Sequence, residues 1–224
     1  MKSILSQTLL SNSVQAFSRS LRLMTWNSFL ALIPLALSFW LFRFQKNRDL
    51  LWWVGLLVFI AFLPNAPYVL TDIIHLIDII RDGYSIWIIT LVIIPQYLIF
   101  IFIGFGSYVL SIVNLGYYLH RNKLGKFTLI VEFTIHALSA IGIYLGRFKR
   151  FNSWDFVTQP QILAQTTIED LADKKPLLVI FVTFIVLFVL YWLMKQVVLS
   201  IIFRLRYKRT LQAQMAEKQE SVLL

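Results

Sequence analysis

Residues 50–76 read LLWWVGLLVFIAFLPNAPYVLTDIIHL, an apolar run that closes in a cluster of prolines and polar side chains. No charged residue occurs from Leu50 to Leu70, and about 20 apolar residues are what a helix needs to cross the hydrocarbon core of a bilayer. The cluster from Leu63 to Leu76 places amide, hydroxyl, carboxyl and imidazole groups where such a crossing ends. This stretch predicts a membrane-spanning helix with a polar site at one membrane surface.

The composition of the whole chain agrees with a membrane protein. Of its 224 residues, 58% are hydrophobic and only 14% are charged, whereas about a quarter of the residues in soluble domains are charged. Uncharged windows as long as a membrane crossing recur along the chain. We therefore predict an all-α fold, a polytopic bundle of transmembrane helices.

Five apolar segments qualify as spanning helices, approximately Thr25–Phe42, Leu50–Leu70, Ile86–Leu119, Phe127–Leu145 and Leu177–Met194. The third would reach about 50 Å as a helix, which is too long for one upright crossing. Two crossings would instead place a turn without polar residues near Gly104, inside the bilayer. We predict five crossings, the third a long helix bent near Pro95, with six crossings as the alternative.

The two ends of the chain differ in composition from the predicted bundle, which covers residues 25–194. Residues 1–24 are basic and free of acidic residues, with apolar residues at near-helical spacing, which favours an amphipathic helix on the membrane surface; a transit peptide has a similar composition. Residues 195–224 predict a basic interfacial helix followed by a polar tail.

Charge predicts how the bundle lies in the membrane. With five crossings, residues 43–49, residues 120–126 and the C-terminal tail share one side and hold twelve of the 21 Lys and Arg residues. Because cytoplasmic loops are enriched in these residues, we expect a cytoplasmic C-terminus. Arg19 and Arg22 argue the other way, since an inside N-terminus would require six crossings.

The net charge of +10 does not predict a nucleic-acid partner, because the basic residues cluster at the ends of apolar runs. There they contact the lipid bilayer, the one partner that the composition implies. The chain contains no cysteine, which excludes disulfides, thiolate metal sites and a cysteine nucleophile. No motif calls for a cofactor.

Three polar clusters are expected on the same, outer side of a five-crossing bundle. They are Trp26-Asn27, the prolines and polar residues from Pro64 to His75, and the basic segment from Arg147 to Asp155. Prolines remove amide donors, so the chain at Pro64 should leave helical geometry and free carbonyl groups for amide side chains to bind. The predicted ligand-binding residues are Asn27, Asn65, Tyr68, Asp72, His75, Arg147, Arg150, Asn152, Trp154 and Asp155.

Arg147 and Arg150 suggest what this outer site binds. They are three residues apart and share a helix face, and guanidinium groups bind phosphate oxygens in a bidentate manner. An anionic lipid headgroup or another phosphorylated ligand would therefore be a natural partner. Ordinary anchoring at the interface, or pairing with Asp72 or Asp155, predicts the same residues.

Asp72, His75 and Asp78 follow one another at spacings of three on the helix after the prolines, with Thr71 or Asp72 as its expected N-cap. They could hold a cation or share a proton, but a solvated polar helix face has the same pattern. We assign no metal site to them.

The fourth span carries Glu132 and His136 at a spacing of four, within the hydrocarbon layer. Ionisable residues there are costly and usually face the interior of the bundle. One hypothesis is a small transporter coupled to protons or ions, and the alternative is a structural pair completed by Asn114.

A third functional hypothesis is a membrane-embedded enzyme that acts on a lipid-linked substrate, with Asp72, His75 or Asp155 as acid or base. No known catalytic motif supports it. The sequence therefore leans away from an enzyme.

The chain resembles the bacterial membrane proteins of domain-of-unknown-function family 1361. The motifs that carry the resemblance are Trp26–Ala31 with Ile33-Pro34-Leu35, Leu63–Leu76, Gly142–Phe148 with Arg150, and Asn152–Asp155. The resemblance extends from Trp26 to about Trp192 and implies a multi-pass protein of the bacterial plasma membrane. It implies no reaction, substrate or cofactor.

Overall fold

The computed structural model describes the backbone of residues 2–45 and 47–223, and the side chains of residues 14, 17, 18, 21–45, 47–208, 210–212, 214 and 215. Every regular element in these ranges is a helix. The α-helices are α1 (Lys2–Phe39), α2 (Leu50–Phe62), α3 (Asn65–Tyr68), α4 (Ile73–Arg81), α5 (Ile86–Ile88), α6 (Ile94–Arg121), α7 (Thr128–Tyr144), α8 (Asp155–Thr158), α9 (Pro160–Ala172) and α10 (Lys174–Leu223). They are joined by three π-helical turns, η1 (Trp40–Phe44), η3 (Ile89–Ile93) and η5 (Leu145–Lys149), and by two 3₁₀ turns, η2 (Val69–Asp72) and η4 (Gly125–Phe127).

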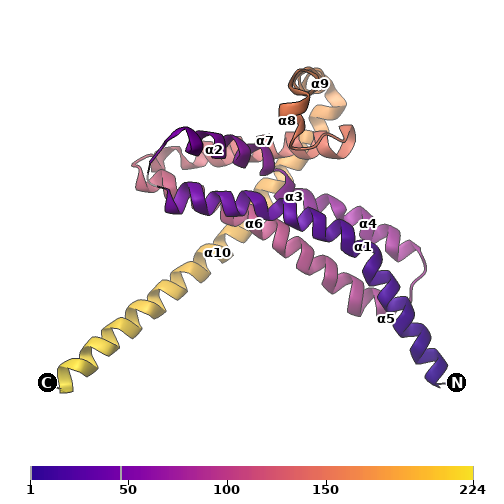
Figure 1. The fold of residues 1–224 in the computed structure, drawn as a ribbon, viewed down its shortest axis with the longest axis horizontal. Helices are drawn as coiled ribbons and strands as arrows, with labels where there is room; N and C mark the ends of the chain where they lie inside the picture. Colours follow the sequence, from indigo (N-terminus) through magenta and orange to yellow (C-terminus); the bar gives the residue numbers. More distant parts are fainter. Residues whose placement is uncertain (1, 46, 224) are drawn as a thin grey trace.

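Within the described residues, five helical stretches are long and apolar enough to cross a membrane: Leu21–Phe44, Leu50–Arg81, Ile86–Arg121, Gly125–Lys149 and Lys174–Gln212. Each contains one of the five predicted segments, so the all-α, polytopic fold is confirmed. Figure 1 shows the beginning of α1 and the end of α10 at opposite ends of the molecule, as an odd number of crossings requires. The chain is a multi-pass membrane protein.

The third span is one continuous helix, which confirms the prediction against two short crossings. It runs for 36 residues, or about 54 Å. Pro95 lacks an amide hydrogen, and the π-helical turn η3 lies just before it. Such a widened turn is how a helix accommodates a missing donor without breaking.

The second span crosses its two prolines without leaving helical geometry, which corrects the prediction of an irregular segment. The side-chain amide of Asn65 donates to the carbonyl oxygen of Phe62 at 3.0 Å, supplying a hydrogen bond beside Pro64. Nor does a new helix start with a side-chain cap, because Thr71 donates back to the carbonyl of Tyr68 at 2.8 Å and Asp72 makes no capping bond. The chain therefore stays helical to Arg81.

The boundaries that the sequence places at residues 24 and 194 fall inside helices and not at helix ends. α1 continues from Lys2 into the first span, and α10 continues beyond the last span as a single helix of 50 residues. The basic segments at both termini are extensions of spanning helices.

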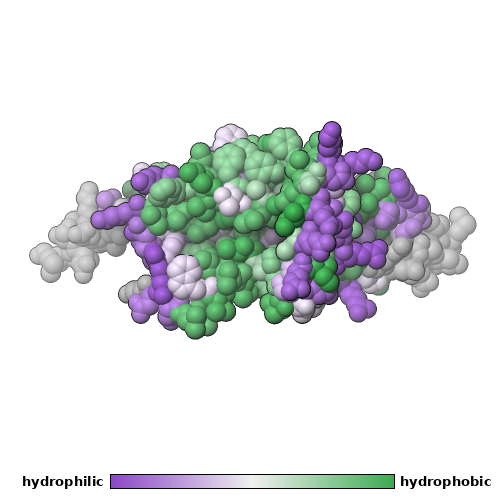
Figure 2. Space-filling view, turned by 90° about the horizontal axis from the view of Figure 1, so that it is seen from above, coloured by the Kyte–Doolittle hydropathy of each residue, from purple (hydrophilic) through white to green (hydrophobic). Residues whose placement is uncertain are grey.

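The surface of the bundle is suited to lipid. Leu57, Leu91 and Phe102 expose 68%, 69% and 64% of their surface, which a soluble protein would not tolerate over a continuous patch. Figure 2 shows the hydrophobic side chains gathered across the middle of the molecule, with hydrophilic side chains towards both ends of the long axis.

The loops after the first and third spans meet at one end of the bundle. Arg48 donates to the side-chain oxygen of Asn122 at 3.1 Å, and Arg43 donates to that of Asn114 at 2.8 Å. These bonds lock α1 and η1 against α6, the helix on which α1 packs most extensively.

Two glycines bring the proline cluster close to its neighbours. A Cβ atom on Gly104 would lie 2.5 Å from a methyl group of Val69, and one on Gly142 would lie 2.7 Å from two ring atoms of Pro64. The absence of a side chain at these positions allows α3 and η2 to pack between α6 and α7, as small residues do in membrane helix pairs. The proline cluster is thus fixed at the centre of the bundle.

The topology can be tested in the cysteine-free background with single cysteines at three exposed positions, Arg81, Lys126 and Gln161. In sealed vesicles, a membrane-impermeant maleimide should label positions 81 and 161 from the same side and position 126 only from the other. Labelling of 81 and 161 from opposite sides would contradict the five-crossing arrangement.

The close contact at Gly142 predicts that Gly142→Ala lowers the thermal unfolding midpoint, because forcing a methyl group into a filled contact typically costs about 1–3 kcal/mol. Gly106→Ala is the matched control, since the nearest atom to its Cβ would be 3.6 Å away, at the mobile end of Met194. Equal midpoints for the two variants in the same detergent would refute the packing argument.

Candidate functional site: a lipid-facing cleft with one unpaired arginine

A cavity with a volume of about 740 Å³ lies between the proline cluster, α7 and α9. α1, α2 and α3 form one wall, α7 and η5 form another, and α8 and α9 lie over it. Its lining residues are Trp26, Asn27, Leu30, Ile60, Ala61, Pro64, Asn65, Tyr68, Leu138, Ile141, Gly142, Leu145, Gly146, Arg150, Phe151, Asn152, Ser153, Phe156, Pro160, Leu163, Ala164, Thr167 and Ile168. We call this cavity the α9 cleft.

The edge of the α9 cleft is apolar. Apolar residues at its edge are largely exposed, with Trp26 at 53%, Phe156 at 53% and Ile168 at 70%. Its interior is mostly aliphatic and aromatic. A ligand with a hydrocarbon chain could therefore enter from the bilayer without crossing a polar barrier.

One hydrogen bond joins the two clusters that the sequence predicted to meet. The amide nitrogen of Asn65, in α3, donates to the hydroxyl of Ser153 at 2.7 Å. Asn65 precedes Ser153 by 88 residues, so this bond ties the second span to the loop after the fourth. Asn152 also lines the cleft, and Tyr68 packs against Gly146, where an added Cβ would lie 3.2 Å from the tyrosine ring.

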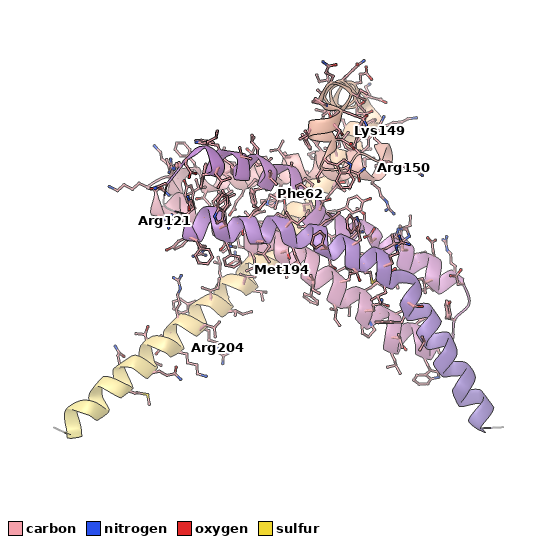
Figure 3. The ribbon with its side chains drawn as sticks, in the orientation of Figure 1. Phe62, Arg121, Lys149, Arg150, Met194 and Arg204 are labelled. Carbon is pink, nitrogen blue, oxygen red and sulfur yellow. The ribbon has the colours of Figure 1, made fainter. Side chains whose placement is uncertain are left out.

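Arg150 is the one charged residue among the residues that line the cleft. Its backbone is left-handed, with φ of 60°, at the position where η5 ends. Among the described residues, no hydrogen bond or ion pair to its guanidinium is found, while the neighbouring Lys149 pairs with Asp170 of α9 at 3.0 Å. Figure 3 shows both residues beside α9, at the opposite end of the bundle from Arg121.

Arg147 occupies a different place from Arg150, although the sequence grouped them on one face. Its Nη1 atom lies 3.7 Å from Oδ1 of Asp72, so the predicted pairing with Asp72 is the arrangement found. The π-helical turn and the left-handed residue at its end interrupt the regular helix on which the two arginines would share a face. Only Arg150 is left to face the cleft.

A polar bridge separates the α9 cleft from a second, smaller cavity. Asn27, which lines the cleft, donates to Oδ2 of Asp72 at 2.6 Å, and Asp72 with His75 lines a cavity of about 220 Å³ on the other side. Three of the predicted residues, Asn27, Asp72 and Arg147, thus form one chain of contacts between the first, second and fourth spans.

Trp154 and Asp155 line neither cavity. Asp155 is buried, and its carboxylate accepts the backbone amide of Asn152 at 2.6 Å and the hydroxyl of Thr158 at 3.0 Å. Its role is to hold the turn that begins α8, and it does not converge with Asp72 or His75.

Helix α9 was not predicted, although it supplies five of the residues that line the cleft. The signal was a proline at the first helical position, Pro160, followed by apolar residues, which is the ordinary pattern of a helix start. This short helix was not assigned from the sequence because it is too polar to span a membrane. Its salt bridge to Lys149 would not be visible in the sequence.

Glu132 and His136 are buried, as predicted, but Asn114 does not complete a pair with them, because it bonds to Arg43 and Ser38. One oxygen of Glu132 accepts both the Tyr191 hydroxyl, at 2.7 Å, and the ammonium group of Lys195. These two residues lie on α10.

His136 forms a 2.7 Å hydrogen bond through Nδ1 with the hydroxyl of Tyr108, while Nε2 is buried without a hydrogen-bond partner among the described residues. The ring also packs against Tyr191, with centroids 4.6 Å apart. Lys195 and the two tyrosines were missed by sequence reasoning, which ended the last span at Met194 and assigned Lys195 to the interfacial tail.

No group of three or more His, Cys, Asp or Glu residues that could hold a metal ion occurs in the part of the chain that the structure describes. The polar groups of the cleft are amides, hydroxyls and one guanidinium. They are donors suited to an anion or a polar headgroup, and not a metal-ligand set.

Comparison with known proteins identifies the family to which the chain belongs. Comparisons with curated proteins and with solved structures gave no significant match. A family model described as protein of unknown function (DUF1361) matches residues 26–189, which contain every residue that lines the α9 cleft. The match covers more than half of the chain and confirms the resemblance carried by the tryptophan–asparagine, proline and arginine motifs: the chain belongs to the DUF1361 family.

Proposed function

We propose that this protein binds a lipid with an anionic headgroup in the α9 cleft, with the acyl chain against the apolar walls and the headgroup beside Arg150. The observation that carries the proposal is the pairing of a large apolar cavity with a single unpaired positive charge at its polar end.

The size of the cleft supports this proposal. At about 740 Å³, it lies within the range of about 300–1,000 Å³ found for small-molecule sites. Its walls are mainly apolar, and its polar residues cluster around Asn65, Asn152 and Ser153. A ligand with a long apolar chain and a compact polar end would match this separation of apolar walls and polar residues.

The charge of the cleft supports an anionic end rather than a neutral one. A guanidinium presents a fork of donors to phosphate or carboxylate oxygens, and Arg150 has no acidic partner among the described residues. Arg150 is exposed at the edge of the cleft, so an anionic headgroup can reach its guanidinium group. Arg147 contributes less, because Asp72 already offsets its charge.

We further propose that the membrane is the plasma membrane of a bacterium and that the C-terminus lies in the cytoplasm. The excess of Lys and Arg on the side of Arg43, Arg121 and the end of α10 supports this orientation. The α9 cleft would then lie towards the outer leaflet.

A transport function based on Glu132 is less well supported, because both Tyr191 and Lys195 already bind one of its oxygens. This geometry is typical of a structural ion pair, in which Lys195 of α10 holds that helix against Glu132 of α7. A catalytic role for Asp155 with Asp72 and His75 has no geometric support in the described residues, since Asp155 faces its own turn.

The lipid-binding proposal predicts that Arg150→Gln reduces the amount of phosphatidylglycerol retained by the purified protein at least about threefold, because a charge-assisted hydrogen bond is lost. Native mass spectrometry of protein extracted from vesicles of stated composition measures the retained lipid. Lys175→Gln, which removes an exposed charge outside the cleft, is the matched control.

A second variant tests occupancy of the cavity without changing charge. Ala164→Trp places a large ring in the α9 cleft and should reduce retention as Arg150→Gln does. Retention equal to wild type in both variants would reject the cleft as the lipid site.

The ion-pair interpretation predicts that Glu132→Gln destabilises the protein by about 1–3 kcal/mol, below the value for a fully buried pair, since 24% of the Lys195 side chain is exposed. Adding Lys195→Met should restore part of the loss, because no unpaired charge then remains. A double-mutant cycle of detergent unfolding midpoints measures this coupling, and additive effects would argue against the pair.

A further inference from the structure

The second cavity, of about 220 Å³, has no part in the proposed lipid site. It lies between α1, α4 and α6, beyond the bridge from Asn27 to Asp72. Its lining residues are Leu23, Met24, Asp72, His75, Asp78, Ile79 and Tyr97. Acidic and aromatic oxygens therefore face a space walled on its other sides by apolar side chains.

The two carboxylates on this cavity keep acceptor atoms free. Asn27 occupies Oδ2 of Asp72, but the nearest positive groups to Oδ1 are Nη1 of Arg147 at 3.7 Å and Nε2 of His75 at 4.0 Å. Oδ2 of Asp78 is 3.9 Å from Nδ1 of His75. These distances are those of ion-pair contacts and are longer than hydrogen bonds, so neither oxygen accepts a hydrogen bond from these groups.

Tyr97 provides an independent sign of a ligand. Its side chain lines the cavity and the residue is only 3% exposed, yet its hydroxyl forms no hydrogen bond with any residue that the structure describes. Asp72 and Asp78 line the same cavity as this side chain. A tyrosine whose side chain is largely buried usually uses its hydroxyl in a hydrogen bond, so Tyr97 offers an unused donor and acceptor on the same cavity as the two carboxylates.

The neighbouring positive residues do not replace that group. His75 lies between the carboxylates but bonds to neither, and Arg147 offsets one negative charge at most. Arg81 is exposed at the end of α4 and forms no ion pair with Asp78 in the described part of the chain. Asp78 therefore remains without an ion-pair partner closer than 3.9 Å at the open edge of the cavity, where 57% of its side chain is exposed.

A primary ammonium group matches these features. It has three N–H donors, and the cavity offers three acceptors from Asp72, Asp78 and Tyr97. The volume is several times that of one water molecule, about 30 Å³, and Leu23, Met24 and Ile79 provide contacts for methylene groups. A bare metal ion fits less well, because a cluster of metal ligands is not found among the described residues.

We propose that the cavity bounded by Asp72, Asp78 and Tyr97 binds the primary ammonium group of a small amine or of an amine-bearing lipid headgroup. The contact geometry assigns Asp78 the main charge and Tyr97 the directional hydrogen bond. This site is distinct from the α9 cleft and does not depend on lipid binding there.

The test uses the full-length protein in nonionic maltoside micelles, with thermal unfolding followed by tryptophan fluorescence. The probes are dodecylamine, dodecyltrimethylammonium, which has no N–H donor, and water-soluble ethanolamine. We expect a saturable rise in the unfolding midpoint with a primary amine and not with the trimethyl analogue. Asp78→Asn and Tyr97→Phe should each weaken the apparent affinity at least about tenfold, because each loses a hydrogen bond to a charged group.

Glu169→Gln, which removes an exposed carboxylate outside both cavities, is the matched control and should respond like wild type. A response to ethanolamine would identify a soluble amine as sufficient, and a response to dodecylamine alone would identify a lipid headgroup. If Asp78→Asn does not fold, the amine response of Tyr97→Phe tests the proposal alone, because phenylalanine keeps the shape of the tyrosine ring.

The proposal is overturned if no primary amine shifts the midpoint, if the trimethyl analogue acts equally, or if the shift survives in Tyr97→Phe. Arg150→Gln should keep the amine response. The outcome is therefore separate from that of the lipid-binding proposal.

Discussion

The arrangement of the half of the bundle that contains the α9 cleft depends on the side-chain amide of Asn65. Inside a membrane, backbone groups that lose a helical partner must find another within the protein, because no water is present to replace it. Asn65 supplies this bond to Phe62 beside Pro64, and the same nitrogen reaches Ser153 in the loop after the fourth span. One side chain therefore keeps the second span helical and also fixes the loop that carries Arg150.

The two cavities follow from this constraint. With α3 held between α6 and α7 by close contacts at Gly104 and Gly142, the loop after η5 and helix α9 have to pass over the proline cluster, and the α9 cleft is the space left beneath them. The bridge from Asn27 through Asp72 to Arg147 closes one side of that space and leaves a separate cavity by α4. Polar residues at the centre of the motifs thus separate two cavities, one lined by Arg150 and the other by Asp72 and Asp78.

Sequence reasoning found the membrane fold, the five spans and the meeting of the two motifs, because these depend on long apolar runs and on the parity of crossings. It failed where local rules gave way to tertiary contacts. The prolines were expected to break the second span, but Asn65 repairs the helix locally. Arg147 and Arg150 were expected to act together, but a π-helical turn ending in a left-handed residue separates them. Lys195 was assigned to the surface, since its partner Glu132 lies 63 residues earlier and no pattern links them.

The length of α10 has a mechanical consequence. Its 50 residues extend for about 75 Å, more than twice the hydrocarbon thickness of a bilayer. A single residue, Asp173, separates it from α9, which covers the cleft, and Lys195 pins it to Glu132 part of the way along. A stiff rod held at an intermediate point acts as a lever, so lateral displacement of its projecting arm would be transmitted to the roof of the α9 cleft at the other end of the bundle.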